Sequence, residues 1–162
     1  MLPVASAVDI AHRREVFHRD IRPSNIILND EGIPKLLGLG FAKSLEDVAA
    51  GGGIAVRHAA DLLFYWAPEC TIEPTHASRE ADVYSLGAVL YGLLAGHPPI
   101  EGKDPVELIG RIRRLRPKPL DALRNDVPHR FSAVIAKAMA KNPADRYADC
   151  QQFIDDLRGA AG

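Results

Sequence analysis

Residues His18 to Asn25 read His-Arg-Asp-Ile-Arg-Pro-Ser-Asn, and they place an acid (Asp20), a cation (Arg22) and an amide (Asn25) close together in the chain. The apolar run 26–28 (Ile-Ile-Leu) follows directly, then the polar stretch 29–32 (Asn-Asp-Glu-Gly), then Lys-Leu-Leu at 35–37. Two short apolar runs joined by polar turn residues are typical of a β-hairpin. The sequence therefore predicts a small hairpin directly after a polar loop.

Three further motifs follow this loop. The stretch 18–25 resembles the catalytic loop of serine/threonine protein kinases, whose pattern is His-Arg-Asp-x-Lys-Pro-x-Asn. The later motifs resemble the family in the family's order: Tyr-Trp-Ala-Pro-Glu at 65–69, Asp-Val-Tyr-Ser-Leu-Gly at 82–87, and Asn-Pro-Ala-Asp-Arg-Tyr at 142–147. The resemblance covers nearly the whole chain. It implies a mainly α fold similar to the C-terminal lobe of a kinase, a helical bundle with a short hairpin beneath the ATP cleft.

The resemblance also implies roles for the loop residues. Asp20 matches the catalytic Asp, which accepts the proton of the substrate hydroxyl, and Asn25 matches a magnesium ligand. Arg22 stands where the family usually has Lys, and a planar guanidinium is not equivalent to a compact ammonium. Ile27 matches a residue that forms the floor of the adenine pocket. An inactive relative can also keep Asp20 as a hydrogen-bonding scaffold, so both interpretations stay open.

One position departs from the family pattern. Gly38-Leu39-Gly40 stands where a kinase carries Asp-Phe-Gly, whose Asp holds magnesium. Gly38 offers no carboxylate, so Asn25 is expected to be a vestigial metal ligand.

Other matched positions are architectural. The resemblance implies a buried ion pair between Glu69 and Arg146, and it places Asp82 near the backbone of the catalytic loop. Three more positions are expected to be structural. His18 matches a core histidine, Arg19 matches the arginine that receives an activation-loop phosphate in the family, and Leu39 stands at the middle position of the replaced Asp-Phe-Gly.

The stretch after this motif lacks the usual phosphorylation switch. No Ser, Thr or Tyr occurs between Leu45 and Phe64, and Leu62 stands where the family commonly has a Thr that contacts the catalytic Asp. Ser44 and Tyr65 are the only flanking hydroxyls, so the usual phosphorylation switch has little to act on.

The resemblance starts part-way through the helix that precedes the catalytic loop. We expect residues 1–159 to be a partial kinase domain and 160–162 a tail. The N-terminal lobe, with its Gly-rich loop and phosphate-gripping Lys, is expected to be absent. This chain alone therefore predicts no cofactor, and ATP and Mg²⁺ are implied only if an N-terminal lobe is present. An exposed cleft floor predicts a protein partner that covers it.

Composition is that of an ordinary globular domain. The 162 residues are 47% hydrophobic and 25% charged, with a formal net charge of −1, which gives no reason to expect nucleic acid as a partner. Two distant cysteines, no signal peptide and no membrane segment favour the cytoplasm. The basic run at 111–118 is expected to be a solvated helix face followed by a loop, and an anion or peptide site is the alternative.

The apolar periodicity predicts several helices. Val4, Val8 and Ala11 recur at helical spacing, and the segment 79–95 is apolar on nearly all faces. Asp104 followed by Pro105 is a helix N-terminus signal, and helices are predicted near 104–115, 130–140 and 148–158.

Two classes of function remain. The first is a non-catalytic kinase-like domain that acts as a binding or regulatory module, or is a truncated remnant. The second is an ATP-dependent serine/threonine kinase whose N-terminal lobe is encoded upstream or supplied by another chain, with Asp20 as the base.

Overall fold

The computed structural model describes residues 1–38 and 62–161, and it confirms the mainly α fold. The longer elements, in chain order, are α1 (Leu2–His12), β1 (Ile26–Leu28), β2 (Pro34–Leu36), α4 (Arg79–Ala95), α5 (Pro105–Arg114), α6 (His129–Ala138) and α7 (Cys150–Ala161). Within these described residues, four short 3-10 helices lie between the longer elements: η1 (Pro23–Asn25), η2 (Glu69–Thr71), η3 (Leu120–Ala122) and η4 (Pro143–Asp145). In the part of the chain that is described, no helix has the length and apolar character needed to cross a membrane.

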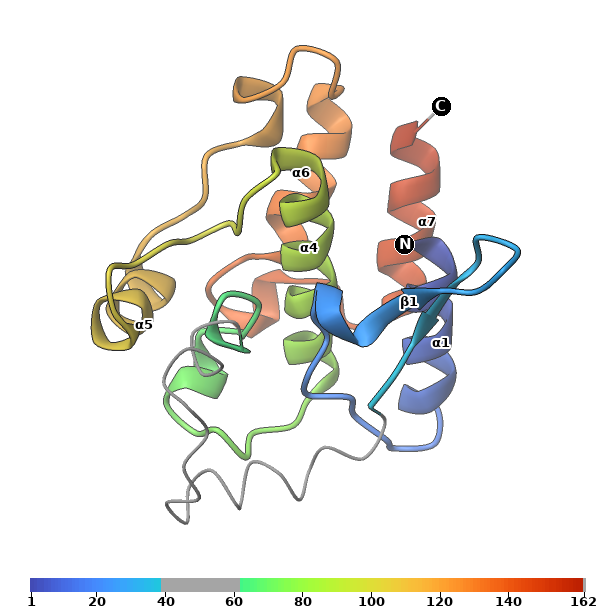
Figure 1. The fold of residues 1–162 in the computed structure, drawn as a ribbon, viewed down its shortest axis with the longest axis horizontal. Coiled ribbons are helices and arrows are strands. Elements are labelled where there is room, and N and C mark those ends of the chain that lie inside the picture. Colours follow the sequence, from blue (N-terminus) through green and yellow to red (C-terminus); the bar gives the residue numbers. More distant parts are fainter. Residues whose placement is uncertain (39–61, 162) are drawn as a thin grey trace.

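Helix α4 forms the centre of the molecule, with α5 on one side and α1 and α7 on the other (Figure 1). Every residue from Ala81 to Tyr91 is buried, because the helix is packed on all sides. The Ser78 side chain accepts a hydrogen bond from the backbone N–H of Ala81 and caps the start of the helix. Gly96 ends it in the left-handed conformation, at φ 79°.

The other long helices of the bundle surround α4, and each has defined neighbours. Helix α6 lies between α4 and α7, and α1 packs against α7, so the N- and C-terminal helices are neighbours. The core includes the large buried side chains of Tyr84, Tyr147 and Phe153. A second, smaller cluster contains Leu108 and Ile112 of α5 and holds that helix against the segment around residue 63.

The contact between α4 and α6 depends on Gly87. A Cβ atom at this position would lie 2.8 Å from the Cβ of Ala138 and 3.2 Å from Cγ of Met139. Gly87→Ala is therefore expected to lower the free energy of unfolding by about 1–3 kcal/mol through overpacking. Gly159→Ala is the matched control, because nothing lies within 4 Å of that site on α7 and the change should stabilise the helix by up to ~1 kcal/mol. Urea unfolding followed by circular dichroism measures both, and equal stability of Gly87→Ala and the parent chain would contradict this packing.

The predicted hairpin is present, with a small difference in the second strand. Strand β1 pairs with β2 in antiparallel register, with Ile26 opposite Leu36 and Leu28 opposite Pro34. The prediction placed the second strand at 35–37, but β2 runs from Pro34 to Leu36. Proline is tolerated at the first residue of an edge strand, where no ladder N–H is needed.

The helix ends also differ slightly from the predicted ones. Helix α5 begins after the cap Asp104, whose carboxylate accepts the backbone N–H of Glu107 at 2.8 Å, and it ends one residue before Leu115. Helix α6 ends at Ala138 and not near 140. Helix α7 continues into the segment expected to be a tail, and Ala160 is buried there, at 4% exposure.

Candidate functional site

The segment 18–25, called the catalytic-loop segment below, is held from beneath by Asp82 of α4. The Asp82 carboxylate accepts the backbone N–H groups of His18 (2.8 Å) and Arg19 (2.9 Å). Its Oδ2 atom also contacts Nε2 of His12 on α1, at 2.8 Å. The Asp82 side chain is 2% exposed, so these donors replace the water that a carboxylate would otherwise require. Arg19 adopts a positive φ of 66°, an uncommon conformation for a residue with a side chain, and its N–H is fixed by this contact.

His18 joins the catalytic-loop segment to the end of the hairpin. Its Nδ1 atom accepts the backbone N–H of Asp20 at 3.3 Å, which leaves Nε2 as the protonated atom. Nε2 donates to the backbone carbonyl of Leu37 at 2.9 Å, beside Gly38. The buried imidazole therefore fixes where the chain leaves β2.

Asp20 lies on this platform and has partners for both of its carboxylate oxygens. The amide nitrogen of Asn25 donates to Oδ2 and to the backbone carbonyl of Asp20, each at 2.8 Å. Nε of Arg22 lies 3.1 Å from Oδ1. The structure thus brings together the three polar residues that the sequence singled out. Asn25 is hydrogen-bonded to Asp20, and Arg22 forms an ion pair with it, although the Arg22 Nε atom makes no hydrogen bond within the described residues.

Burial raises the pKa of Asp20 above the ordinary value of an aspartic acid, and Asn25, Arg22 and His18 oppose that shift. The Asp20 side chain is only 5% exposed, so desolvation of the ionised form is the largest effect. A higher pKa makes the carboxylate a stronger proton acceptor than a solvated aspartate. The geometry therefore keeps the chemical requirement for a general base.

The surroundings of Gly38 do not fit the two-magnesium arrangement of a kinase. Gly38 adopts a positive φ of 89° and has no side-chain oxygen. Asn25 supplies one neutral amide, while both oxygens of Asp20 already face Arg22 and Asn25. In residues 1–38 and 62–161, no three His, Cys, Asp or Glu side chains are grouped so that they could hold a metal ion. Charge neutralisation of a triphosphate normally relies on carboxylate-bound magnesium, and the second carboxylate is missing here.

Ile27 and its neighbours on the hairpin are open to solvent. Ile27 is 46% exposed and Leu28 is 69% exposed, and Ile33 and Leu37 are also exposed. An apolar surface of this kind is typical of a face that another chain segment or protein covers. Leu39 lies outside the described residues, and so does the part of the stretch without Ser, Thr or Tyr that ends at residue 61.

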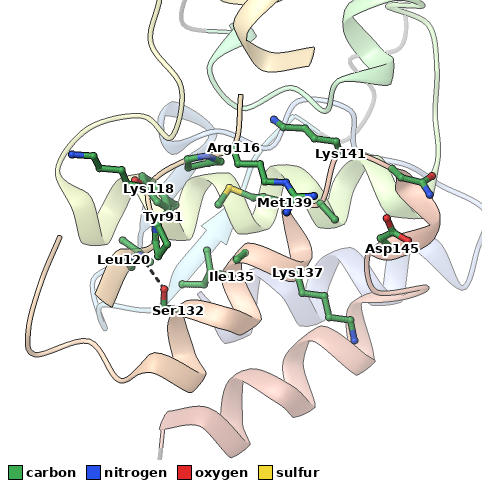
Figure 2. Close-up of a pocket in the computed structure, with 15 residues that line it drawn as sticks. Tyr91, Arg116, Lys118, Leu120, Ser132, Ile135, Lys137, Met139, Lys141 and Asp145 are labelled. Carbon is green, nitrogen blue, oxygen red and sulfur yellow. Dashed lines mark hydrogen bonds between the residues drawn. The ribbon is translucent and has the colours of Figure 1, made fainter. Parts of the chain in front are cut away.

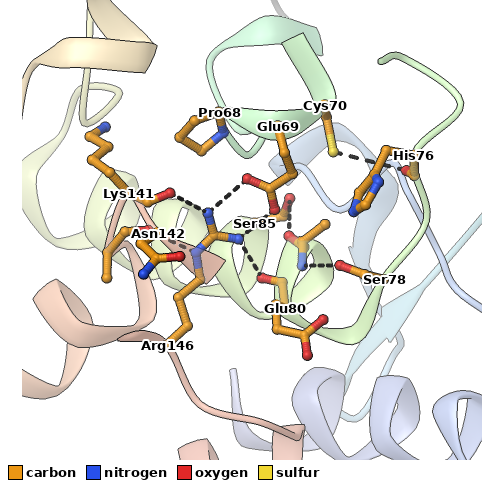
Figure 3. A network of polar contacts seen from close by, with 12 residues as sticks. Pro68, Glu69, Cys70, His76, Ser78, Glu80, Ser85, Lys141, Asn142 and Arg146 are labelled. Carbon is orange, nitrogen blue, oxygen red and sulfur yellow. Dashed lines mark hydrogen bonds and ion pairs between the residues drawn. The ribbon is translucent and has the colours of Figure 1, made fainter. Parts of the chain in front are cut away.

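Glu69 and Arg146 form an ion pair that links η2 to the segment after η4. Arg146 donates to both oxygens of Glu69, with Nη1–Oε1 at 2.6 Å and Nη2–Oε2 at 2.8 Å. Its guanidinium also donates to the backbone carbonyls of Ala140, Glu80 and Lys141 (Figure 3). The Arg146 side chain is 0% exposed, so its charge is stabilised by this set of acceptors.

Sequence reasoning missed the role of His12. Its ring is buried between Asp82 and Cys150, whose Sγ atom lies 3.7 Å from Nδ1. The available signal was its spacing, because Val4, Val8 and His12 recur every four residues along one face of α1. A histidine on a buried helix face needs a polar partner, and Asp82 provides it.

Comparisons with known proteins agree with this geometry. A model of the protein kinase domain matches residues 1–156. The chain is 38% identical over 159 residues to the serine/threonine-protein kinase PknE of Mycobacterium tuberculosis, covering 98% of this chain and 26% of that protein. It is 34% identical over 157 residues to the probable serine/threonine-protein kinase PknB of Bifidobacterium longum, covering 97% of this chain and 22% of that protein. The kinase domain of PknI from Mycobacterium tuberculosis, solved as a variant, superposes with a TM-score of 0.68 at 31% identity, covering 98% of this chain and 51% of that one.

Proposed function

Because the chain belongs to the protein kinase family, with serine/threonine kinases as relatives, we propose that it is a non-catalytic kinase-like domain that acts as a binding or regulatory module. The observation that carries this proposal is Gly38. The residue at this position of an active kinase holds the magnesium that bridges the phosphates of ATP, and a glycine cannot do so.

The contacts around Asp20 support a structural role for the catalytic-loop segment. Within the loop itself, Asn25 donates a hydrogen bond to Oδ2 of the Asp20 carboxylate, and the Arg22 guanidinium forms an ion pair with Oδ1. Asp82 fixes the backbone of the same loop from below. These contacts hold the loop in place whether or not the domain transfers phosphate, so the case for a non-catalytic domain rests on Gly38.

The exposed hairpin supports a protein partner. Ile27, Leu28, Ile33 and Leu37 present apolar surface that folding of the described residues leaves uncovered. We expect a partner protein or protein domain to cover it, because large exposed apolar groups favour association. Both cysteines are free thiols, which agrees with the reducing cytoplasm expected for this protein.

The chain spans about a quarter of the length of the curated relatives named above. The proposal above therefore concerns these 162 residues and not the activity of a full-length protein that contains them. An active serine/threonine kinase is the second candidate. The cluster of Asp20, Asn25 and Arg22 favours it, since an oriented carboxylate with a raised pKa is what a base requires. In that case ATP and Mg²⁺ are the cofactors, and the DNA upstream of Met1 should encode in frame a Gly-rich loop followed by Ala-x-Lys.

Nucleotide binding separates the two candidates. We expect this chain to show no thermal shift with Mg-ATP at millimolar concentration, because the phosphates lack a carboxylate-bound metal. The measurement is differential scanning fluorimetry with ATP alone, Mg²⁺ alone and Mg-ATP, with Asp20→Asn as a matched variant. A shift that requires Mg²⁺ and ATP together would contradict the proposal.

A further inference from the structure

The structure contains a pocket of about 560 Å³, and its lining residues are far along the chain from the catalytic-loop segment. It opens between the end of α4, the extended stretch before η3, helix α6 and the start of η4. None of its lining residues belongs to the segment 18–38. The volume falls within the range of about 300–1,000 Å³ that is usual for ligand sites.

The floor of the pocket is apolar. Tyr91, Leu120, Ile135 and Met139 line it, and all four are buried in the core. Ser132 also lines it, but its Oγ atom already accepts the backbone N–H of Leu120 at 3.0 Å (Figure 2). The floor therefore suits an apolar group that needs no hydrogen bond.

The walls of the pocket are strongly cationic. Four lining side chains are basic and only Asp145 is acidic, although the whole chain carries a net charge of −1; the basic residues are Arg116, Lys118, Lys137 and Lys141. Lys137 is already engaged, with its ammonium 4.0 Å from the centre of the Tyr147 ring. Arg116 and Lys118 have no ion-pair partner among the residues that the structure describes. They are the free positive charges of the site.

Lys141 adds a third cation that is poorly solvated. Its ammonium donates to the backbone carbonyl of Ile112 at 2.7 Å. Burial, together with the positive charges of the nearby Arg146 and Arg116, lowers the pKa of Lys141 to about 8, and burial is the largest of these causes. A carboxylate in the pocket would offset this repulsion.

The cations are spread along the pocket. Figure 2 shows Arg116 and Met139 near the middle, Lys118 and Tyr91 on one side, and Lys141 and Asp145 on the other. The stretch 116–119 reads Arg-Pro-Lys-Pro, so two prolines stiffen the wall that presents two of the charges. Separated cations above an apolar floor match several spaced carboxylates better than one carboxylate at the end of an acyl chain.

We propose that this pocket binds an acidic peptide segment of a partner protein, with a bulky apolar side chain of the peptide on the floor formed by Tyr91, Leu120, Ile135 and Met139. The carboxylates of the peptide pair with Arg116 and Lys118, while Lys141, whose ammonium is already held by the Ile112 carbonyl and lies 5.7 Å from the centre of the Tyr84 ring, adds to the positive charge of the pocket. The proposal does not depend on whether the catalytic-loop segment transfers phosphate, because the two sites share no residue.

The test is fluorescence anisotropy of a short fluorescein-labelled peptide, Leu-Phe flanked by Glu and Asp, titrated with the full chain. Two altered peptides accompany it, one with Gln and Asn in place of the acids and one with Ser-Ser in place of Leu-Phe. We expect the parent peptide to bind, and both altered peptides to bind at least about tenfold more weakly.

Variants of the chain locate the binding. Arg116→Glu with Lys118→Glu, and separately Ala136→Trp, which fills the pocket from an exposed lining position, should each weaken binding by about tenfold or more. The matched control is Lys35→Glu with Lys103→Glu, two exposed lysines outside the pocket with the same change in net charge, and it should bind as the parent does. Circular dichroism melts verify that each variant is folded.

Several results would overturn the proposal. Absence of binding by the parent chain, equal loss in the control variant, or equal binding of the Ser-Ser peptide would each show that no specific peptide site exists. Laurate tests the other occupant considered above, a single carboxylate at the end of an acyl chain. If laurate binds, Ala136→Trp abolishes that binding and the peptide does not bind, the pocket is a site for an acyl carboxylate instead.

Discussion

Arg146→Met is expected to lower the free energy of unfolding by about 3–5 kcal/mol, because it leaves the Glu69 carboxylate without its partner in a partly buried position. The same change removes the donors for three backbone carbonyls, those of Ala140, Glu80 and Lys141. Methionine fills much of the volume of the arginine stem, so the substitution leaves little cavity. The drop in the free energy of unfolding therefore comes mainly from the lost polar contacts.

Urea unfolding measures the effect, and Arg158→Met is the matched control. Arg158 lies on α7 with its side chain 59% exposed and 3.8 Å from Asp155, so its loss should change stability by less than ~0.5 kcal/mol. A change below ~1 kcal/mol for Arg146→Met would mean that the link between η2 and the segment after η4 does not hold the fold together.

Asp82→Ala is expected to cost a similar amount, about 3–5 kcal/mol, since it strands the backbone N–H groups of His18 and Arg19 and the buried ring of His12. The effect should also be local. Without its acceptor, the Arg19 N–H has nothing to hold the positive φ of 66°, so the catalytic-loop segment should open more readily.

Amide hydrogen exchange combined with urea unfolding checks this result. We expect faster exchange at His18 and Arg19 than global destabilisation alone produces. Glu73→Ala, at an exposed position, serves as control and should stay within ~0.5 kcal/mol of the parent chain. Unchanged exchange at residues 18 and 19 would show that Asp82 does not fix the loop.

Local chemistry made much of the fold predictable. Asp104 and Pro105 mark the start of α5, and the apolar run at 79–95 marks the central helix. Both signals come from residues that are close together in the sequence, because a cap or a burial pattern involves only a few neighbouring positions. The motifs also pointed to Glu69 with Arg146, which lie 77 positions apart and are in contact. That pairing came from resemblance to a family and not from the residues alone.

Other features could not be derived from the sequence in this way. The role of His12 depends on Asp82 and Cys150, which reach it only through packing of α1 against α4 and α7. The pocket above Tyr91 and Met139 gathers cations from two separate segments. The sequence showed Arg116 and Lys118 as part of a basic run, and it gave no sign that Lys137 and Lys141 lie beside them. The spacing of Val4, Val8 and His12 marks a buried face of α1, but periodicity does not tell which residues of other segments that face meets.

The candidate site shows a division of roles among its residues. Asp82, His18 and His12 support the loop from below, and they are satisfied without any ligand. Asn25 donates a hydrogen bond to the Asp20 carboxylate, and Gly38 has no side-chain oxygen to hold a metal. On this account the loop survives because it stabilises the fold.

Phosphate transfer tests the central claim most directly. The measurement is the transfer of the labelled γ-phosphate of Mg-ATP to a generic basic protein, by the parent chain, by Gly38→Asp and by Asp20→Asn. We expect no transfer above background from any of the three, since restoring one carboxylate does not supply a lysine to grip the phosphates. Robust transfer by the parent chain that Asp20→Asn abolishes, or rescue by Gly38→Asp alone, would contradict the account.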